Sequence, residues 1–321
     1  MCPISSSIAT TDSTAVMLPF KLVYHEGYDL RLGQHVFQSQ KFRMVRDLLL
    51  ADHIAEPSDI LAPEPATDED ILRVHTREWV DKCLHDKLTL SERMRLEIPY
   101  SEAAVKGFWL AAGGSILAAH CAAKEGFGIN IGGGFHHAFP GHGEGFCMIH
   151  DVAVAIRRLQ SEGALRRVLI VDTDVHQGNG TAAIFAGDAD VFTLSLHQEN
   201  NYPEPKPPSD LDVNLADGVG DEEYLELLDK ALASAFRRFA PEMIFYIGGA
   251  DPYREDQLGG LRLSMRGLQE RDALVFAEAR LRQLPVAVAF AGGYARNVED
   301  TVRIHVNTII AAREASAAHV S

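Results

Sequence analysis

Several features that would define a class of protein are scarce or missing in this chain of 321 residues. The four cysteines, Cys2, Cys83, Cys121 and Cys147, are widely spaced and form no Cys-x-x-Cys pair, so they indicate neither a zinc knuckle nor a disulfide framework. Cysteine usage of this kind fits a reducing compartment, and we expect a cytoplasmic protein. No apolar run approaches the ~20 residues that a membrane span needs, so no membrane partner is expected.

Positive charge is also in short supply. Lys and Arg number 30 against 45 Asp and Glu, which gives a formal net charge of -15. Contacts to phosphates need a basic stripe, and its absence argues against a nucleic-acid-binding protein. The glycine runs at 132–134 and 141–145 spell neither the dinucleotide fingerprint nor a Walker loop, which argues against a nucleotide site. Nothing in the pattern indicates an oligomeric state.

What the sequence does contain is an alternation of strands and helices. Short apolar runs bounded by Gly, Asp or Pro predict buried strands at 21–24, 127–131, 167–171, 191–196, 243–247 and 286–290. Helical spacing appears at 105–123, 152–162, 222–239, 268–281 and 298–312. The Pro-rich segments 57–65 and 203–208 are predicted to be surface loops. The pattern predicts an α/β fold with one doubly wound parallel sheet.

Polar residues gather directly after four of these strands. The four segments are Gly-Gly-Gly-Phe-His-His (132–137), Asp-Thr-Asp-Val-His-Gln-Gly-Asn-Gly (172–180), Gly-Gly-Ala-Asp-Pro-Tyr (248–253) and Ala-Gly-Gly-Tyr (291–294). In open parallel sheets, ligands bind outside the carboxyl ends of the strands. We therefore expect these loops to carry the chemistry.

The second of these segments has the spacing of a metal site. Asp174 and His176 are two residues apart on an extended segment, so both side chains point the same way. Asp251, from another strand end, would complete a three-ligand set with a position open for water, as in catalytic zinc sites. Asp172 shares the spacing but is expected to turn inward as support. One aspartate alone would more often cap a helix, whereas the combination favours a metal.

The adjacent histidines His136 and His137 are candidates for general acid–base catalysis. Such work needs an imidazole that is oriented through its other ring nitrogen, and Asp172 and Asn179 are available to orient the two rings. A lone buried histidine is more often structural. Tyr294 follows two glycines and is a candidate donor to a developing oxyanion; the alternative is a tyrosine that simply packs at a strand end.

Taken in order, these motifs resemble those of the zinc-dependent histone deacetylase-like amidohydrolases. The resemblance also rests on Gly-Glu-Gly-Phe-Cys (143–147), Ser-Leu-His (195–197), Leu-Gly-Gly-Leu (258–261) and Val-His-Thr-Arg-Glu-Trp-Val (74–80). It implies the arginase/deacetylase fold, an eight-stranded parallel sheet with helices on both faces. The catalytic domain would span 19–315, between flexible tails at 1–18 and 316–321. The compact length and the Gln-Gly-Asn-Gly segment are most similar to the class IV branch and its bacterial relatives.

The resemblance also implies roles for individual residues. Asp174, His176 and Asp251 match ligands of Zn²⁺, although the same donors suit Fe²⁺. Among the catalytic residues, His137 matches the proton shuttle, Asp172 the partner of His136, and Tyr294 the tyrosine that polarises the substrate carbonyl. Gly145 and Phe146 match the floor and wall of a substrate channel, and Tyr202 the opposite wall. A structural K⁺ or Na⁺ would use Asp172, Asp174, His176, Ser195 and Leu196.

The implied reaction is hydrolysis of an acyl group, acetyl or a longer fatty acyl, from an amine. The amine is expected to be the side chain of an acylated lysine in a peptide or protein. Some subfamilies carry aspartate where this chain has Asn179. His137 is therefore expected to be less basic here than in those subfamilies.

Three other functions were compared with this one. A small amine such as an acetylpolyamine is an alternative substrate, but Leu258 stands where relatives specialised for polyamines carry an acidic residue. A non-catalytic homologue that binds acyl-lysine would have lost a ligand, a catalytic histidine or the tyrosine, and this chain has lost none. An arginase-like dinuclear manganese enzyme would need an aspartate where Gly178 stands.

Overall fold

The computed structural model describes residues 18–317. Eight strands form one sheet in the order β2-β1-β3-β8-β7-β4-β5-β6, and every neighbouring pair is parallel. This confirms the α/β fold with eight parallel strands. The strands are β1 (Lys21–Val23), β2 (Ile60–Leu61), β3 (Phe127–Asn130), β4 (Val168–Asp172), β5 (Val191–Gln198), β6 (Leu211–Leu215), β7 (Met243–Gly248) and β8 (Val286–Phe290).

The six strands predicted from apolar runs form the interior of the sheet, and the two edge strands were missed. β2 lies inside the Pro-rich segment 57–65, and the prediction of a loop there is wrong at Ile60–Leu61, which pair with Leu22 and Val23. β6 is half exposed along most of its length. Edge strands that are short or half exposed need no continuous apolar run, so the pattern that reveals buried strands does not reveal them.

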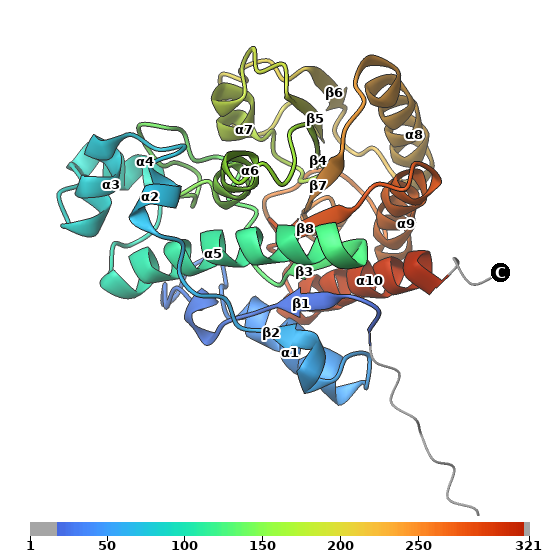
Figure 1. Cartoon of the computed structure of the whole chain (residues 1–321), viewed down its shortest axis with the longest axis horizontal. Coiled ribbons are helices and arrows are strands. Elements are labelled where there is room, and N and C mark those ends of the chain that lie inside the picture. Colours follow the sequence, from blue (N-terminus) through green and yellow to red (C-terminus); the bar gives the residue numbers. More distant parts are fainter. Residues whose placement is uncertain (1–17, 318–321) are drawn as a thin grey trace, which may run out of the picture.

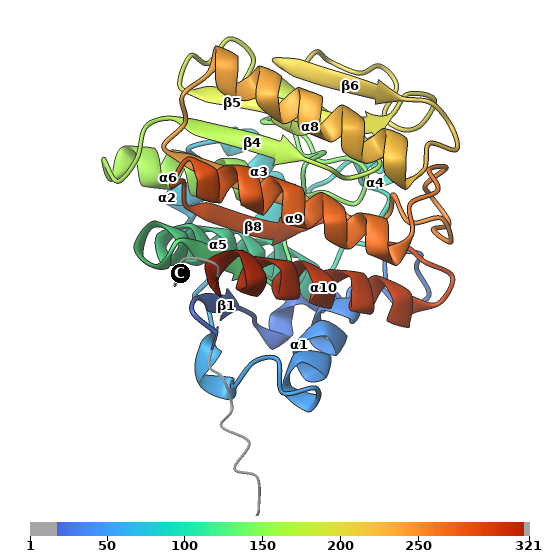
Figure 2. The ribbon, with the colours of Figure 1, turned by 90° about the vertical axis from the view of Figure 1, so that its right-hand side faces the viewer.

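Helices cover both faces of the sheet (Figures 1 and 2). α8, α9 and α10 lie side by side across one face, with α1 next to α10, and α5 and α6 pack together on the other face. The bounds of these helices are α1 (Lys41–Ala51), α5 (Glu102–Glu125), α6 (Asp151–Ser161), α8 (Asp221–Arg238), α9 (Met265–Leu281) and α10 (Val298–Ala317). Shorter elements are η1 (Glu26–Tyr28), η2 (Pro57–Asp59), α2 (Asp68–Ile71), α3 (Arg77–Leu84), α4 (Leu90–Leu96) and α7 (Asn179–Ile184).

Alternation along each strand explains why both faces need a helical cover. In β4, Val168 and Ile170 belong to the core on the α6 side, whereas Leu169 and Val171 belong to the core on the opposite side. All four are fully buried. Burying one such side chain contributes about 1.5–3 kcal/mol relative to leaving it exposed. The strand is therefore held from both faces, which fixes the position of the loop that follows it.

The two tails that were expected at 1–18 and 316–321 fall mostly outside the described residues. Leu18, the first described residue, is buried, and its backbone N–H donates to Asp59 at 3.1 Å. At the other end α10 continues to Ala317, two residues into the expected tail. Between residues 18 and 317, no helix has the length and the apolar character needed to cross a bilayer.

The strand order decides where the polar loops meet. The four segments singled out in the sequence follow β3, β8, β7 and β4, which are consecutive neighbours in the sheet. Neighbouring strands are only ~4.8 Å apart. Because all the strands are parallel, their carboxyl ends share one edge, and residues far apart in the sequence come together there.

Candidate active site

The carboxyl ends of β4 and β7 bring two carboxylates and one imidazole together. Asp174 and His176 follow β4, Asp251 follows β7, and one ligand atom from each residue lies within 4.8 Å of the other two. All three side chains are buried. His176 Nδ1 lies 3.0 Å from Asp174 Oδ1 and 3.3 Å from Asp251 Oδ2. The structure thus places the three residues predicted as metal ligands in one cluster.

The hydrogen bonding of the cluster leaves an acceptor unused. Asp251 Oδ1 accepts the backbone N–H of Val175 at 2.9 Å. Asp251 Oδ2 is buried and has no hydrogen-bond partner within the described part of the chain. An unsatisfied buried carboxylate oxygen is costly, and a cation shared with Asp174 and His176 would satisfy it. One imidazole and two carboxylates are donors that Zn²⁺ accepts, so these residues fit a single divalent ion.

Asp251 is expected to make the stability of the metal-free protein depend on pH. Burial, followed by the negative charge of Asp174, raises the pKa of Asp251 from 3.8 to about 7. Between these two pH values the folded chain holds a proton that the unfolded chain has released, so this group lowers stability as pH rises from about 4 to about 7.

The variant Asp251→Asn keeps an oxygen acceptor for Val175 but does not titrate. After chelator treatment, the urea midpoint of the wild type should therefore fall across this pH range relative to that of the variant. Parallel pH curves for the two proteins would show that Asp251 does not retain a proton in the fold.

The loop after β8 passes directly against these ligands. Asp174 Oδ2 accepts the backbone N–H of Gly292 at 2.7 Å. A Cβ atom at Gly292 would clash with Asp251 Oδ2 and press on Asp174 Oδ2 as well. A side chain at this position would displace the carboxylates. Steric crowding therefore explains why glycine stands at position 292, in the Gly-Gly pair before Tyr294.

The two adjacent histidines lie beside the metal-ligand cluster and point at different partners. His136 Nδ1 donates to Asp172 Oδ2 at 2.6 Å, and its Nε2 lies 3.7 Å from Asp174 Oδ1. His137 Nδ1 lies 2.7 Å from Asn179 Oδ1. Both rings are buried, with centroids 4.1 Å apart. Each imidazole is therefore oriented through Nδ1.

Their surroundings separate the two histidines electrostatically. Burial lowers the pKa of His136, but the charges of Asp172 and Asp174 outweigh it and raise that pKa to about 9. Burial lowers the pKa of His137 well below its ordinary value, and the neighbouring His136 and His176 lower it further. Two groups of the same type whose pKa values are pushed apart suit different tasks in acid–base chemistry. His137 is the ring that stays neutral and can accept a proton.

The backbone around Tyr294 is anchored from two directions. Asp256 Oδ2 accepts the N–H of Tyr294 at 2.7 Å. On the other side, the fully buried Lys41 donates to the carbonyls of Ala291 at 3.0 Å and Gly293 at 3.3 Å. These contacts fix the loop without using the phenol group of Tyr294.

The ring of Tyr294 is held by aromatic packing, and its hydroxyl is kept protonated. The centroids of Phe37 and Phe146 lie 6.4 Å and 5.9 Å from that of Tyr294. Burial, and then the charges of Asp174 and Asp251, raise the pKa of Tyr294 well above its ordinary value. The hydroxyl is therefore a hydrogen-bond donor throughout the neutral pH range.

A hollow of about 190 Å³ leads to these groups from the surface. All four residues predicted to contact substrate line it, together with others, namely Gly145, Phe146, Tyr202, Leu258, Glu97, His137, His176, Asn201 and Tyr294. The ring of Tyr202 stands edge-on to His137, with centroids 4.9 Å apart. A second, more enclosed hollow of about 20 Å³ adjoins it at Tyr294 and reaches Gly134 and Cys147.

The residues predicted for a monovalent cation come from β4, from the loop that follows it and from the neighbouring strand β5. Asp172 on β4 is in register with Ser195 on β5, and Leu196 follows as a buried residue. Ser195 Oγ lies 2.9 Å from His197 Nδ1. The site for K⁺ or Na⁺ stays a prediction.

Three residues that build the site were not singled out in the sequence. Asp151 accepts the N–H groups of Gly134 at 3.0 Å and Phe135 at 2.8 Å, and so shapes the loop before the histidines. Lys41 and Glu144 also contact the site loops. Glu144 lies within the Gly-Glu-Gly-Phe-Cys motif, which was a usable signal. Lys41 and Asp151 have no such signal, because only the fold brings them near the site.

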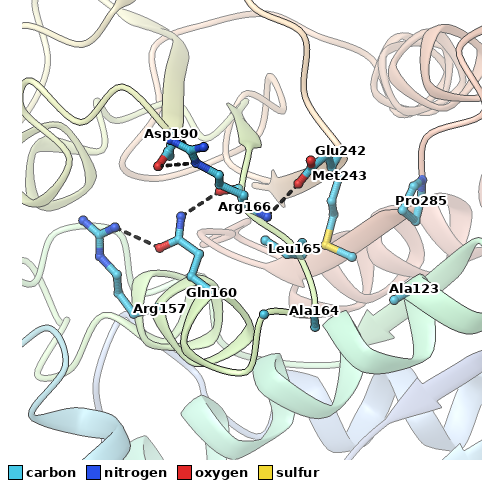
Figure 3. Close-up of a pocket in the computed structure, with 11 residues that line it drawn as sticks. Ala123, Arg157, Gln160, Ala164, Leu165, Arg166, Asp190, Glu242, Met243 and Pro285 are labelled. Carbon is cyan, nitrogen blue, oxygen red and sulfur yellow. Dashed lines mark hydrogen bonds and ion pairs between the residues drawn. The ribbon is translucent and has the colours of Figure 1, made fainter.

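Another hollow, of about 780 Å³, lies at the opposite edge of the sheet (Figure 3). Its charged side chains are paired with neighbours. Arg166 contacts Asp190 at 2.9 Å, and Glu242 accepts the backbone N–H groups of Arg166 at 2.6 Å and Arg167 at 3.0 Å. These contacts tie together the chain segments just before β4, β5 and β7, and the hollow does not resemble a reaction centre.

The chain is similar to known proteins over most of its length. The family model of the histone deacetylase domain matches residues 35–309. An uncharacterised protein of Picosynechococcus is 39% identical over 296 residues, which cover 92% of this chain and 99% of that protein. Histone deacetylase 2 of Arabidopsis thaliana is 33% identical over 300 residues, which cover 88% and 77% of the two chains.

A solved structure has the same fold. The crystal structure of a histone deacetylase homologue complexed with SAHA matches with a TM-score of 0.78 and 26% identity, over 93% of this chain and 84% of that one.

Proposed function

The chain belongs to the histone deacetylase domain family, and from that premise we propose that it hydrolyses acyl-lysine, with acetyl as the preferred acyl group. Family membership makes it a deacetylase-type hydrolase that cleaves an amide. The main support for hydrolysis of acyl-lysine is the buried cluster of Asp174, His176 and Asp251. The cluster lies beside His137 and Tyr294, at the inner end of a channel.

We propose Zn²⁺ as the ion at Asp174, His176 and Asp251, with Fe²⁺ as the alternative that the same donors suit. When bound, the ion would polarise the amide carbonyl and lower the pKa of a water molecule. The buried Asp251 Oδ2, which has no hydrogen-bond partner in the described chain, supports a bound cation at this position.

The chain's own groups would move the proton and hold the developing charge. His137, neutral and with Nδ1 facing Asn179, would accept the proton of the attacking water at Nε2. The hydroxyl of Tyr294 would donate to the oxyanion that forms on the carbonyl. His137 would then pass its proton to the leaving nitrogen as the C–N bond breaks. His136, paired with Asp172, would remain protonated and add positive charge near the reacting centre.

The shape of the channel supports a lysine side chain with a short acyl group. Phe146 and Tyr202 form opposite walls, which suit a chain of methylene groups. The enclosed hollow beyond them is about 20 Å³, roughly the room that a single small group or water molecule needs. A long fatty acyl chain would not fit there without rearrangement.

An acetylated peptide is therefore expected to be cleaved faster than its longer counterparts. The measurement follows deacylation of one peptide carrying acetyl-, octanoyl- or myristoyl-lysine by mass spectrometry, with Zn²⁺-loaded protein and a chelator control. We expect chelator-sensitive cleavage with kcat/KM highest for acetyl. Faster cleavage of myristoyl-lysine would mean that the inner hollow opens, and no cleavage of any peptide would count against a lysine substrate.

A small cationic amine is the second candidate substrate. Leu258 carries no charge, but Glu97, which lines the same hollow, carries a carboxylate. An acidic group near the mouth would favour a positively charged acylated amine. Cleavage of an acetylpolyamine with a higher kcat/KM than the acetyl-lysine peptide would favour this candidate.

Three further assignments complete the proposal. The Gln-Gly-Asn-Gly segment at 177–180 supports the class IV branch of the family and its bacterial relatives. The free thiols of Cys83, Cys121 and Cys147 support a cytoplasmic location. Retention of all the ligands, both histidines and the tyrosine speaks against a non-catalytic acyl-lysine-binding homologue.

A further inference from the structure

Glu144 is a largely buried carboxylate behind the channel wall that none of the steps above uses. It is held in a tight turn, where its N–H donates to the Cys147 carbonyl at 3.1 Å and its carbonyl accepts the Cys147 N–H at 2.9 Å. Its side chain is 14% exposed. The two carboxylate oxygens meet three hydrogen-bonding side chains, one from the same turn and two from distant segments of the chain.

The two distant donors come from the catalytic centre and the channel wall. Glu144 Oε1 accepts a hydrogen bond from Asn179 Nδ2 at 2.5 Å and another from the Tyr202 hydroxyl at 2.9 Å. Glu144 Oε2 lies 3.1 Å from His142 Nε2. Asn179 is the residue that contacts His137. One carboxylate therefore reaches both the partner of the proton shuttle and the wall of the substrate channel.

The contacts of Asn179 allow only one orientation of its amide. In the observed orientation, Oδ1 accepts from His137 Nδ1 at 2.7 Å and from the N–H of Gly180 at 3.0 Å, while Nδ2 donates to Glu144. A flipped amide would set its NH₂ group against the Gly180 N–H and its oxygen against the carboxylate of Glu144. Both contacts would be repulsive, because neither pair would contain a donor and an acceptor.

This orientation in turn determines which nitrogen of His137 carries the proton. A carbonyl oxygen cannot donate, so His137 Nδ1 must hold the hydrogen and Nε2 must hold the lone pair. Nε2 is the atom that has to accept a proton in the proposed reaction. The same network explains why position 179 carries an amide: an ionised carboxylate there would face that of Glu144 at hydrogen-bond distance.

We propose that Glu144 is a positioning residue of the catalytic centre, which locks the Asn179 amide and thereby keeps His137 in the tautomer with Nε2 free. The inference rests on the proposed function, in which His137 is the proton shuttle. It adds a third member, Glu144, to the pair formed by His137 and Asn179. The link to Tyr202 means that the same carboxylate also steadies one wall of the channel.

The first test is a double-mutant cycle on kcat with the Zn²⁺-loaded full chain. Glu144→Ala is expected to lower kcat about tenfold, a typical loss for a partner that orients a catalytic histidine. Glu144→Gln keeps an acceptor for Asn179 and should retain most of kcat. If Glu144 acts through Asn179, adding Glu144→Ala to Asn179→Ala should lower kcat no further. Multiplying losses in the double variant would overturn the proposal.

The control is another hydrogen-bonded glutamate, a more exposed one, at the far edge of the sheet. Glu242 also accepts two hydrogen bonds, one from the backbone N–H of Arg166 (Figure 3) and one from that of Arg167. Glu242→Ala should lower the thermal midpoint without changing kcat. Metal content and thermal midpoint, measured for every variant, separate a loss of catalysis from a loss of fold.

The second test does not depend on turnover. With ¹⁵N-labelled histidine, long-range imidazole NMR spectra report which ring nitrogen carries hydrogen, and the His137 signals are assigned by their loss in His137→Ala. Wild type and Glu144→Gln should show the Nδ1–H form, and Glu144→Ala a mixture. A pure Nδ1–H form in Glu144→Ala would overturn the inference. If the wild type cleaves no acyl-lysine, the proposed function fails, and this spectrum still decides the role of Glu144.

Discussion

Replacing Asp251 by alanine is expected to give a folded protein that no longer retains a divalent ion and no longer hydrolyses acyl-lysine. The wild type, loaded with Zn²⁺ and dialysed, should keep about one ion per chain, as a catalytic site with three protein ligands does. Asp251→Ala should keep close to none, and deacylation should fall to the chelator-treated background. This is the largest effect that the structure predicts for a single substitution.

The reason lies in where the ligands come from. Asp174 and His176 belong to one loop after β4, and Asp251 is the ligand contributed by β7. Without it, the remaining pair would have to hold the ion from one side only. Asp251 Oδ2 is also the oxygen that has no hydrogen-bond partner within residues 18–317. The other side-chain contacts of Asp251 are the Val175 N–H at Oδ1 and the neighbouring ligand His176 at Oδ2, so its removal affects the ion more than the fold.

The measurement is the metal-to-protein ratio by mass spectrometry after dialysis, together with the peptide assay. Asp256→Asn is a useful comparison, because Asp256 is a carboxylate near the site that accepts the backbone N–H groups of Leu258, Gly259 and Tyr294. It should retain the ion, since Asp256 does not belong to the cluster. An unchanged metal ratio in Asp251→Ala would remove Asp251 from the ligand set.

The sheet and the chemistry of its loops were predictable because both follow from strong local patterns. Strands buried on both faces need continuous apolar runs, so β3, β4, β7 and β8 were visible, and so were the polar segments after them. Their consecutive places in the sheet were not visible, because residue patterns do not encode strand order. Once that order is known, the proximity of Asp174 to Asp251 follows from parallel strands that end at one edge.

The supporting residues were harder to predict for a different reason. Lys41 holds the loop before Tyr294 from a helix 250 residues away in the sequence. A lysine in a helix normally faces solvent, and nothing local distinguishes this one, which is completely buried. Glu144 was within a recognised motif, but its role depends on the amide of Asn179, and that relation exists only in the fold. Reactive groups are therefore easier to predict from the sequence than the groups that orient them.

The Tyr294→Phe variant is expected to bind its ion normally and to lose about a hundredfold in kcat, a typical cost of removing one oxyanion donor. The substitution isolates the hydroxyl, because other contacts hold the rest of the residue in place. Asp256 anchors the backbone, and Phe37 and Phe146 pack around the ring. Phenylalanine should therefore occupy the same position, and the ring should still border the channel.

The kinetic form of the loss distinguishes a transition-state donor from a wall of the channel. A hydroxyl that donates only to the developing oxyanion lowers kcat and kcat/KM by the same factor and leaves KM unchanged. A residue that only lines the channel would instead raise KM. Because the pKa of Tyr294 is held well above its ordinary value by burial and by Asp174 and Asp251, the hydroxyl remains a donor, and the loss should be similar from pH 7 to pH 9.

Tyr24→Phe is the matched control. Tyr24 is also buried, but its hydroxyl donates to Glu26 at 3.0 Å, away from the site. It should leave kcat unchanged at equal metal content. If Tyr294→Phe with bound ion turned over at nearly the wild-type rate, the oxyanion would have to be held without the phenol, and the mechanism would have to assign that charge to the ion and the histidines alone.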